Sequence, residues 1–178
     1  MNPLDAAGPS ADGECMQTTR QRLVAWNDPH ELAAAAQQRT GLEFLQAIAS
    51  GELAQPPIGD VLGFRLTHVV EGQATFTTEM DERHFNLIGS VHGGLPATLI
   101  DSASGCAVYS TLAREDAWTT VHLDIDYLRP LPGSGPVTCT GRVVRVGRRI
   151  GVADAEIIDA DGRVCARGSS RCLIVRGG

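Results

Sequence analysis

One stretch of the chain, HFNLIGSVHGGLPATLID, concentrates the groups that could carry out chemistry. It holds His92, Gly93 and Gly94 at the expected opening of a helix, and Asp101 follows nine residues after the histidine. N–H groups in the first turn of a helix have no intrahelical acceptor, so they can bind an oxygen that becomes negative, and glycines let a substrate reach them. A carboxylate can act as a general base. The pattern indicates an oxyanion hole and a base, with Asn86 as a third polar group.

Each of these features also has an ordinary structural explanation. A Gly-Gly pair before a helix is often only a bend in the chain. Asp101, in the third turn, could face solvent or form a tertiary ion pair, although no arginine lies three or four residues away from it. A stripe of small residues that includes Gly94, Ala97 and Thr98 suits tight packing against a second helix, or close approach of another chain or a slender ligand. The residues alone leave these alternatives open.

The longer segment NLIGSVHGGLPATLIDSASG resembles the signature of the hotdog-fold acyl-CoA thioesterases of the phenylacetic-acid-degradation (PaaI) type. That family reads Asn, Gly, His-Gly-Gly and then Asp nine residues after the His. The later segment TTVHLDIDYLRP is similar to the next strand of that family, in which a Ser or Thr often lines the site. The resemblance covers about residues 40 to 175. The matching positions are Asn86, Gly89, His92, Gly93, Gly94, Asp101 and Thr120.

The resemblance implies a thioesterase that cleaves an acyl-CoA to a free carboxylic acid and CoA. Asp101 would act as general base or nucleophile, the Gly93 N–H would hold the oxyanion, and Asn86 and His92 would position the water, the carbonyl or the loop. The acyl-CoA substrate would be bound with help from Gly89, Gly94, Thr98 and Thr120. No metal and no cofactor beyond the CoA moiety of the substrate is expected. The alternatives are a non-catalytic acyl-CoA-binding hotdog protein and an enoyl-CoA hydratase, whose D-x-N-P-x-H-like run is absent here.

Helix geometry predicts that the site is shared between subunits. Nine residues turn a helix by about 900°, which is half a turn net, and advance it by about 13 Å. His92 and Asp101 on one helix therefore face nearly opposite ways. They can meet in one site if each pairs with the other's copy on a neighbouring subunit. This agrees with the family resemblance, which implies a homodimer and, beyond it, a dimer of dimers.

The elements that would position these residues follow in a simple order. Residues 1–25 are rich in Ala, Gly, Ser, Pro and Asp and are expected to be disordered. Residues 26–55 read as a helical arm, after which QPPIGD is expected to stop helicity. Residues 56–178 then read as a hairpin around Glu71-Gly72, a long helix from about Gly93 to Leu112, and four strands. One long helix and one antiparallel sheet predict an α+β hotdog domain with an N-terminal helical extension.

The first of the four strands, WTTVHLDIDYL, alternates along its length. Strict alternation would put Val121, Leu123 and Tyr127 on one apolar face and Thr120 on the opposite polar face with Asp124. Away from this strand, the arginines of GRVVRVGRRIG are expected at a solvated hairpin end, or alternatively at the phosphates of the bound coenzyme.

Composition sets the remaining limits. The net charge of −6 and pI near 5.3 argue against a nucleic-acid partner, and every basic residue is an arginine. Five cysteines without CxxC spacing argue against a zinc cluster or a disulfide framework and favour a reducing cytoplasm. No apolar run reaches the roughly 18 residues that span a bilayer, so no membrane partner is expected.

Overall fold

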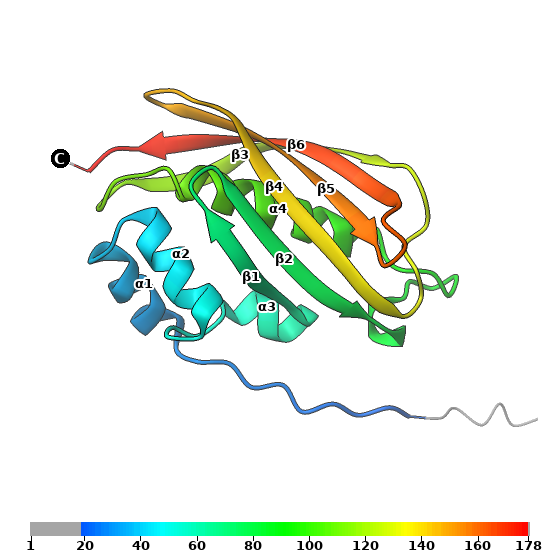
Figure 1. The fold of residues 1–178 in the computed structure, drawn as a ribbon. Helices are drawn as coiled ribbons and strands as arrows, with labels where there is room; N and C mark the ends of the chain where they lie inside the picture. The colour runs from blue at the N-terminus through cyan, green and yellow to red at the C-terminus, as the bar shows by residue number, and fades with distance from the viewer. Residues whose placement is uncertain (1–18, 178) are drawn as a thin grey trace, which may run out of the picture.

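Six antiparallel strands form one sheet in the computed structural model, which describes residues 19–177. The long helix α4 (Gly94–Tyr109) packs against one face of this sheet (Figure 1). The predicted α+β arrangement of a hairpin, one long helix and four more strands is confirmed, although α4 ends three residues before the predicted Leu112. Across the sheet the order is β1 (Phe64–Val70), β2 (Gln73–Met80), β4 (Gly135–Val146), β5 (Ile150–Asp159), β6 (Val164–Val175) and β3 (Ala117–Tyr127).

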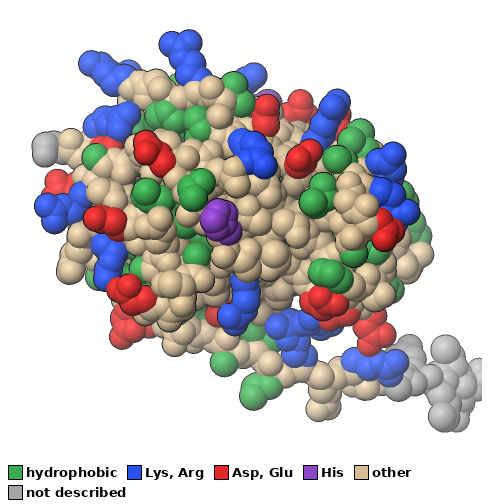
Figure 2. Space-filling view, viewed as in Figure 1, with side chains coloured by type: hydrophobic (Ala, Val, Ile, Leu, Met, Phe, Trp, Pro, Cys, Tyr) green, Lys and Arg blue, Asp and Glu red, His purple; other side chains and the backbone are tan. Residues whose placement is uncertain are grey.

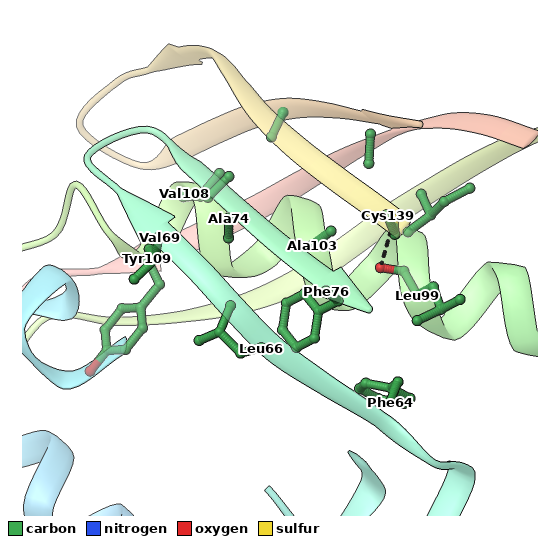
Figure 3. Packing of buried hydrophobic residues seen from close by; sticks show 14 of the residues in the cluster. Phe64, Leu66, Val69, Ala74, Phe76, Leu99, Ala103, Val108, Tyr109 and Cys139 are labelled. Atoms are coloured by element: carbon green, nitrogen blue, oxygen red, sulfur yellow. Dashed lines mark hydrogen bonds between the residues drawn. The ribbon is translucent and has the colours of Figure 1, made fainter. Parts of the chain in front are cut away.

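The core lies between α4 and the sheet, where Leu99 and Ala103 of the helix meet Phe76 and Cys139 (Figure 3). The helix sits directly on the backbone of β4 at Gly141, because a Cβ added there would lie 2.2 Å from the Ala103 carbonyl oxygen. The Cys139 thiol also donates to the Leu99 carbonyl at 3.4 Å. These contacts fix how closely α4 lies on the sheet. Asp101 lies between the two contacting residues, Leu99 and Ala103, so its position is fixed with them.

The first two helices of the N-terminal arm begin with side-chain caps, and the second ends at a left-handed glycine. Helix α1 (Pro29–Gln37) begins after Asp28, whose carboxylate accepts from the His30 N–H at 2.8 Å. Helix α2 (Gly41–Ser50) begins with a capping box between Thr40 and Glu43, and ends at Gly51 with a φ of 84°. Phe44 of α2 meets Tyr109 of α4 edge-on, at 6.0 Å between ring centroids. The arm is therefore packed against the C-terminal end of α4, the helix that carries Asp101.

The prediction that QPPIGD stops helicity is wrong, because Pro57–Leu62 form helix α3. Proline lacks an N–H but is tolerated in the first helical turn, where that N–H has no partner. Here Pro56 precedes the helix and Pro57 opens it, so the pair starts a new helix as well as separating it from α2. The helix ends at Gly63, which has a φ of 80°.

The chain before α1 is extended where it is described. Arg20 pairs with Glu82 at 2.9 Å, and Arg22 donates to the Asp60 carbonyl at 3.0 Å, at the end of α3. Of the segment 1–25 that the sequence predicts to be disordered, residues 19–25 take this extended path (Figure 1). Residues 1–18, with Cys15, lie outside the described part of the chain.

Strand β3 forms one edge of the sheet and contains a bulge. Thr120 pairs with Cys172 and His122 with Arg171, so Val121 has no partner residue on β6. The extra residue changes the alternation. Thr120 therefore lies on the same face of the sheet as Leu123 and Tyr127, toward α4, and the prediction that it lies on the opposite face is wrong.

The face of the sheet that points away from α4 carries scattered charges of both signs (Figure 2). A shallow cavity of about 470 Å³ on this face is lined by both signs as well, and Arg167 pairs there with Asp126 at 3.1 Å. The four arginines of GRVVRVGRRIG are exposed, as predicted. Among residues 19–177, no helix is long and apolar enough to cross a membrane.

Candidate active site

The approach to the site is fixed by the short 3₁₀ helix η1 (Glu82–His84). Asp81 caps it, and hydrogen bonds from the Arg83 guanidinium hold the pKa of the Asp81 carboxyl at about 2. His84 is buried; its Nδ1 accepts from the Asp81 N–H at 3.2 Å, and its Nε2 lies 2.9 Å from the Leu62 carbonyl. The imidazole therefore ties the loop to α3 with its proton on Nε2.

Asn86 opens a tight loop and bonds within it. Its Oδ1 accepts from the N–H groups of Ile88 and Ser90 at 3.0 and 3.2 Å, and its Nδ2 donates to the Ser90 hydroxyl at 3.0 Å. Gly89 provides the left-handed residue that this loop needs, with a φ of 76°. The His92 N–H then donates to the His84 carbonyl at 2.7 Å and closes the loop. Asn86 is thus the residue that shapes the entry into the His-Gly-Gly turn.

The His-Gly-Gly turn leaves one N–H group free. His92 Nδ1 accepts from the Gly94 N–H at 2.8 Å, and the His92 carbonyl accepts from the Leu95 N–H at 3.0 Å. A Cβ at Gly94 would crowd that imidazole nitrogen at 3.0 Å, which explains the second glycine. The N–H of Gly93 donates to no described residue. Because the His92–Gly93 peptide is anchored through its carbonyl, this free donor is fixed in direction.

Tyr127 holds the same turn from the sheet. Its hydroxyl donates to the Gly93 carbonyl at 2.9 Å, and that carbonyl also accepts from the Ala97 N–H at 3.3 Å. A Cβ at Gly93 would lie 3.5 Å from the Tyr127 hydroxyl, an ordinary contact distance. Packing therefore does not require glycine at position 93, whereas approach of a substrate to its N–H benefits from it.

Asp101 lies half-buried in the third turn of α4 and has one described hydrogen-bond donor. The Thr120 hydroxyl donates to its Oδ1 at 2.8 Å. No described arginine or histidine lies within ion-pairing distance of its carboxylate, so the tertiary ion pair considered above is not formed within residues 19–177.

The Cys106 thiol lies close to Asp101 on α4. Burial raises the pKa of this thiol to about 12, and the Asp101 carboxylate adds to this effect. Cys106 is therefore a neutral thiol at physiological pH.

The predicted residues fall into two groups within one chain. Asp101 and Thr120 form one group, and the Asn86 loop with the His92–Gly94 turn forms the other. Gly93 and Asp101 are eight positions apart, which is about 12 Å along the helix axis, and no hydrogen bond joins the groups. Thr98 lies between them, half-buried, with its hydroxyl donating to the Gly94 carbonyl at 2.9 Å. Each chain therefore carries two separate halves of the predicted site.

Two residues of this arrangement escaped the sequence analysis. Ser90 accepts and donates within the Asn86 loop, and its signal was a hydroxyl four residues after an asparagine. Tyr127 was counted as part of an apolar face, although a tyrosine at the end of a strand carries a polar group that needs a partner. Among residues 19–177, no three His, Cys, Asp or Glu side chains come together as a metal site would require.

Comparison with known proteins identifies the family. Residues 88–166 match the family described as Thioesterase superfamily. Human acyl-coenzyme A thioesterase 13 is 30% identical over 110 residues, which cover 61% of this chain and 78% of that protein. A relative from Halobacterium salinarum is 44% identical over 72 residues, which cover 39% of this chain and 46% of that protein, so the match spans about half of its length.

Solved structures agree with this match. The E. coli PaaI protein from the phenylacetic acid degradation operon superposes with a TM-score of 0.65 at 27% identity, over 82% of this chain and 97% of that chain. A thioesterase family protein from Silicibacter pomeroyi gives 0.67 at 26% identity, over 75% and 99% of the two chains. The hotdog fold and the resemblance to the PaaI type are thereby confirmed. The chain belongs to the thioesterase superfamily of thioester hydrolases.

Proposed function

We propose that the protein is an acyl-CoA thioesterase that hydrolyses its substrate to a free carboxylic acid and CoA. The observation that carries this proposal is the free N–H of Gly93, fixed in direction at the mouth of α4 while the neighbouring Gly94 N–H is taken by His92 Nδ1. A fixed donor with no other partner is what a developing oxyanion needs. The names of the relatives, which include acyl-coenzyme A thioesterase 13, support the same substrate class.

In the proposed reaction the thioester carbonyl oxygen accepts from the Gly93 N–H. Asp101 takes a proton from water through Oδ2 while the water oxygen bonds to the carbonyl carbon, since Oδ1 is already bonded to Thr120. The tetrahedral intermediate then breaks its C–S bond, and CoA leaves as a thiolate that regains a proton. A direct attack by Asp101 would instead form an anhydride with the acyl group as the C–S bond breaks and CoA thiolate leaves, and water would then cleave the anhydride to the free acid and the Asp101 carboxylate.

We propose that two chains share each site. The free edge of β3 supports this, because two copies of this edge can pair antiparallel about a two-fold axis. The residue of β3 nearest that axis then lies opposite its own copy. Thr120 and Tyr127 mark the two half-sites along β3, and the midpoint between them falls between Leu123 and Asp124. Pairing centred on either residue would bring Thr120, and with it Asp101, within one position of Tyr127 of the partner subunit. Pairing of two such dimers through another surface is a further expectation.

The other predicted residues take supporting roles in this proposal. Asn86 and His92 shape the turn that presents the Gly93 N–H, and His92 does so through Nδ1, which accepts from the Gly94 N–H. Gly89, Gly94, Thr98 and Thr120 would contact the substrate, with the CoA moiety as part of it and no separate cofactor. The four cysteines of the described chain are free thiols, which fits a cytoplasmic protein.

Mass-spectrometric assay of free acid and CoA from a panel of acyl-CoAs tests the proposal. Turnover that survives EDTA is expected. Binding of acyl-CoA without turnover would favour the non-catalytic alternative, and hydration of an enoyl-CoA would favour the hydratase. A single turnover in ¹⁸O-labelled water tests direct attack: label in the Asp101 carboxylate requires an anhydride that water cleaves at the Asp101 carboxyl carbon, whereas a general base leaves that carboxylate unlabelled.

A further inference from the structure

A cavity of about 320 Å³ opens beside the Gly93 turn, between the start of α4, the end of β3 and the loop that follows it. Gly93 and Tyr127 form part of its wall. The remaining walls are mainly aliphatic and come from four separate segments of the chain. Their apolar members are Val91, Pro96, Leu128, Pro130, Leu131 and Ala166.

The polar groups of this cavity are already engaged by the protein. The Tyr127 hydroxyl donates to the Gly93 carbonyl, and the Arg129 Nη1 donates to the Val164 carbonyl at 2.7 Å. At the same place Tyr127 and Leu128 are 58% and 47% exposed in the single chain, so apolar surface is uncovered where the cavity opens, beside the edge at which we propose the partner subunit pairs. Burial of such surface by an apolar ligand is favourable. A ligand with polar substituents would find few groups to bond with.

Gly93 connects the cavity to the proposed chemistry. Its N–H is the proposed oxyanion donor, and the residue itself lines the cavity. A thioester carbonyl oxygen on that N–H places the first carbon of the acyl chain one bond beyond the carbonyl carbon, at the cavity entrance. The acyl chain can therefore enter the cavity while the CoA sulfur stays outside it.

We infer that this cavity holds the aliphatic acyl chain of the substrate, and that it selects chains of about six to ten carbons. The inference rests on the proposed thioesterase function. At about 30 Å³ for each non-hydrogen atom, 320 Å³ accommodates about ten of them. Longer chains must leave the cavity and gain nothing further from it. Acetyl and butanoyl groups leave most of it empty.

The test is the dependence of kcat/KM on chain length, from acetyl-CoA to dodecanoyl-CoA. In the wild-type protein kcat/KM should rise about fourfold for each added methylene group, up to eight to ten carbons, and then level off or fall. A flat profile from acetyl to decanoyl, or a continued rise to dodecanoyl, would overturn the inference while leaving the thioesterase function intact. No hydrolysis of any acyl-CoA would contradict the proposed function itself.

Two variants locate the effect. Leu131→Trp fills the cavity from its loop wall, so the break in the profile should move to about four carbons. Ala166→Leu fills it from β6 and should give the same shift. Val144→Trp adds comparable bulk at a position that is 61% exposed and outside the cavity, and should leave the profile unchanged. A uniform loss for all chain lengths in both cavity variants, with the fold retained, would argue against the inference.

Binding of S-alkyl-CoA thioethers, which cannot be hydrolysed, tests the cavity without turnover. Calorimetry should show that S-octyl-CoA binds at least tenfold more tightly than S-ethyl-CoA to the wild-type protein. Leu131→Trp should remove this difference. Equal affinities for the two thioethers in the wild-type protein would contradict the cavity assignment whether or not the enzyme is active.

Discussion

The Thr120 hydroxyl donates to Asp101 Oδ1 at 2.8 Å, from a strand to the third turn of the helix packed against it. This bond occupies one carboxylate oxygen and orients the other. Oδ2 has no described donor and can accept a proton from water. The strand therefore does more than cover the helix, because it selects which oxygen of Asp101 is free.

Asp101→Asn is expected to lower kcat by a factor of about 10²–10⁴ with little change in KM, because the amide keeps the shape of the carboxylate but is no base. Steady-state kinetics of the two proteins measures this. Asp154→Asn lies on the outer face of the same sheet, in the interior strand β5 and away from the proposed subunit pairing, so it is the matched control and should keep wild-type kcat. If Asp101→Asn retains most of its kcat, Asp101 is a structural residue.

Gly93→Pro removes the proposed oxyanion donor with little disturbance of the turn. Gly93 has a φ of −60°, close to the value that proline fixes, and its N–H bonds to no described residue. Loss of one oxyanion donor should lower kcat by about 10²–10³. Gly93→Ala keeps the N–H and adds a methyl group at ordinary contact distance, so its kcat should be clearly higher than that of the proline variant. Equal kcat values for the two, at equal thermal stability, would exclude the Gly93 N–H as the donor.

Tyr127→Phe is expected to lower kcat about three- to tenfold while KM changes by less than twofold. The hydroxyl holds the Gly93 carbonyl and so positions the turn, without touching the reacting atoms itself; a hydrogen bond of this kind contributes about 0.5–1.5 kcal/mol. Kinetics together with the melting temperature separates this from a general loss of stability. A fall in melting temperature with unchanged kcat would give Tyr127 a purely structural role.

The shared site predicts that two inactive variants restore each other. Subunits of Asp101→Asn and Gly93→Pro, mixed in equal amounts with free exchange, give about one half mixed dimers, and each of these holds one intact site. Activity should recover to about a quarter of the wild-type value. Mass spectrometry confirms the exchange. If exchange is complete and no activity returns, each site is built from a single chain.

Acid should weaken the loop before the site through Asp81. Its pKa of about 2, held low by the hydrogen bonds from Arg83, lies below the value of about 3.9 for an unfolded aspartate. The carboxylate therefore stabilises the fold above about pH 4, and this contribution is lost as the pH falls toward 2. Asp81→Asn should lower the free energy of unfolding at pH 7, and the difference from wild type should shrink toward zero near pH 2. Urea titrations at pH 7, 4 and 2.5 measure it. A difference that does not depend on pH would show that the charge of Asp81 contributes nothing.

The sequence predicts the fold class and the order of the elements well because helix caps and strand periodicity are local. Asp28, the Thr40–Glu43 capping box and Gly51 all act within a few residues of themselves. Helix α3 was missed because two prolines were read as a stop, although a proline can also open a helix.

The candidate site was harder to predict because its contacts join distant segments. Tyr127 lies 34 residues from Gly93, and Thr120 lies 19 residues from Asp101. The Gly94 N–H donates to His92 Nδ1, which leaves the Gly93 N–H as the free donor. This arrangement depends on the backbone conformation of the turn, so the residue types alone do not predict it. The half-turn between His92 and Asp101 assumed that both residues lie on one helix; α4 begins at Gly94, so His92 precedes it and the predicted angle does not carry over.

Because Val121 has no partner on β6, the alternation of side chains along β3 reverses at this residue. Even-numbered residues before it, Trp118 and Thr120, face the helix, and after it the odd-numbered Leu123, Ile125 and Tyr127 do. The ring of Trp118 stacks on Tyr109, so the early part of the strand is anchored independently of the later part. Loss of this single residue would force one part to turn over, and would separate Asp101 or Gly93 from its hydroxyl partner. Val121 touches neither half-site, yet its bulge lets both Thr120 and Tyr127 point toward α4.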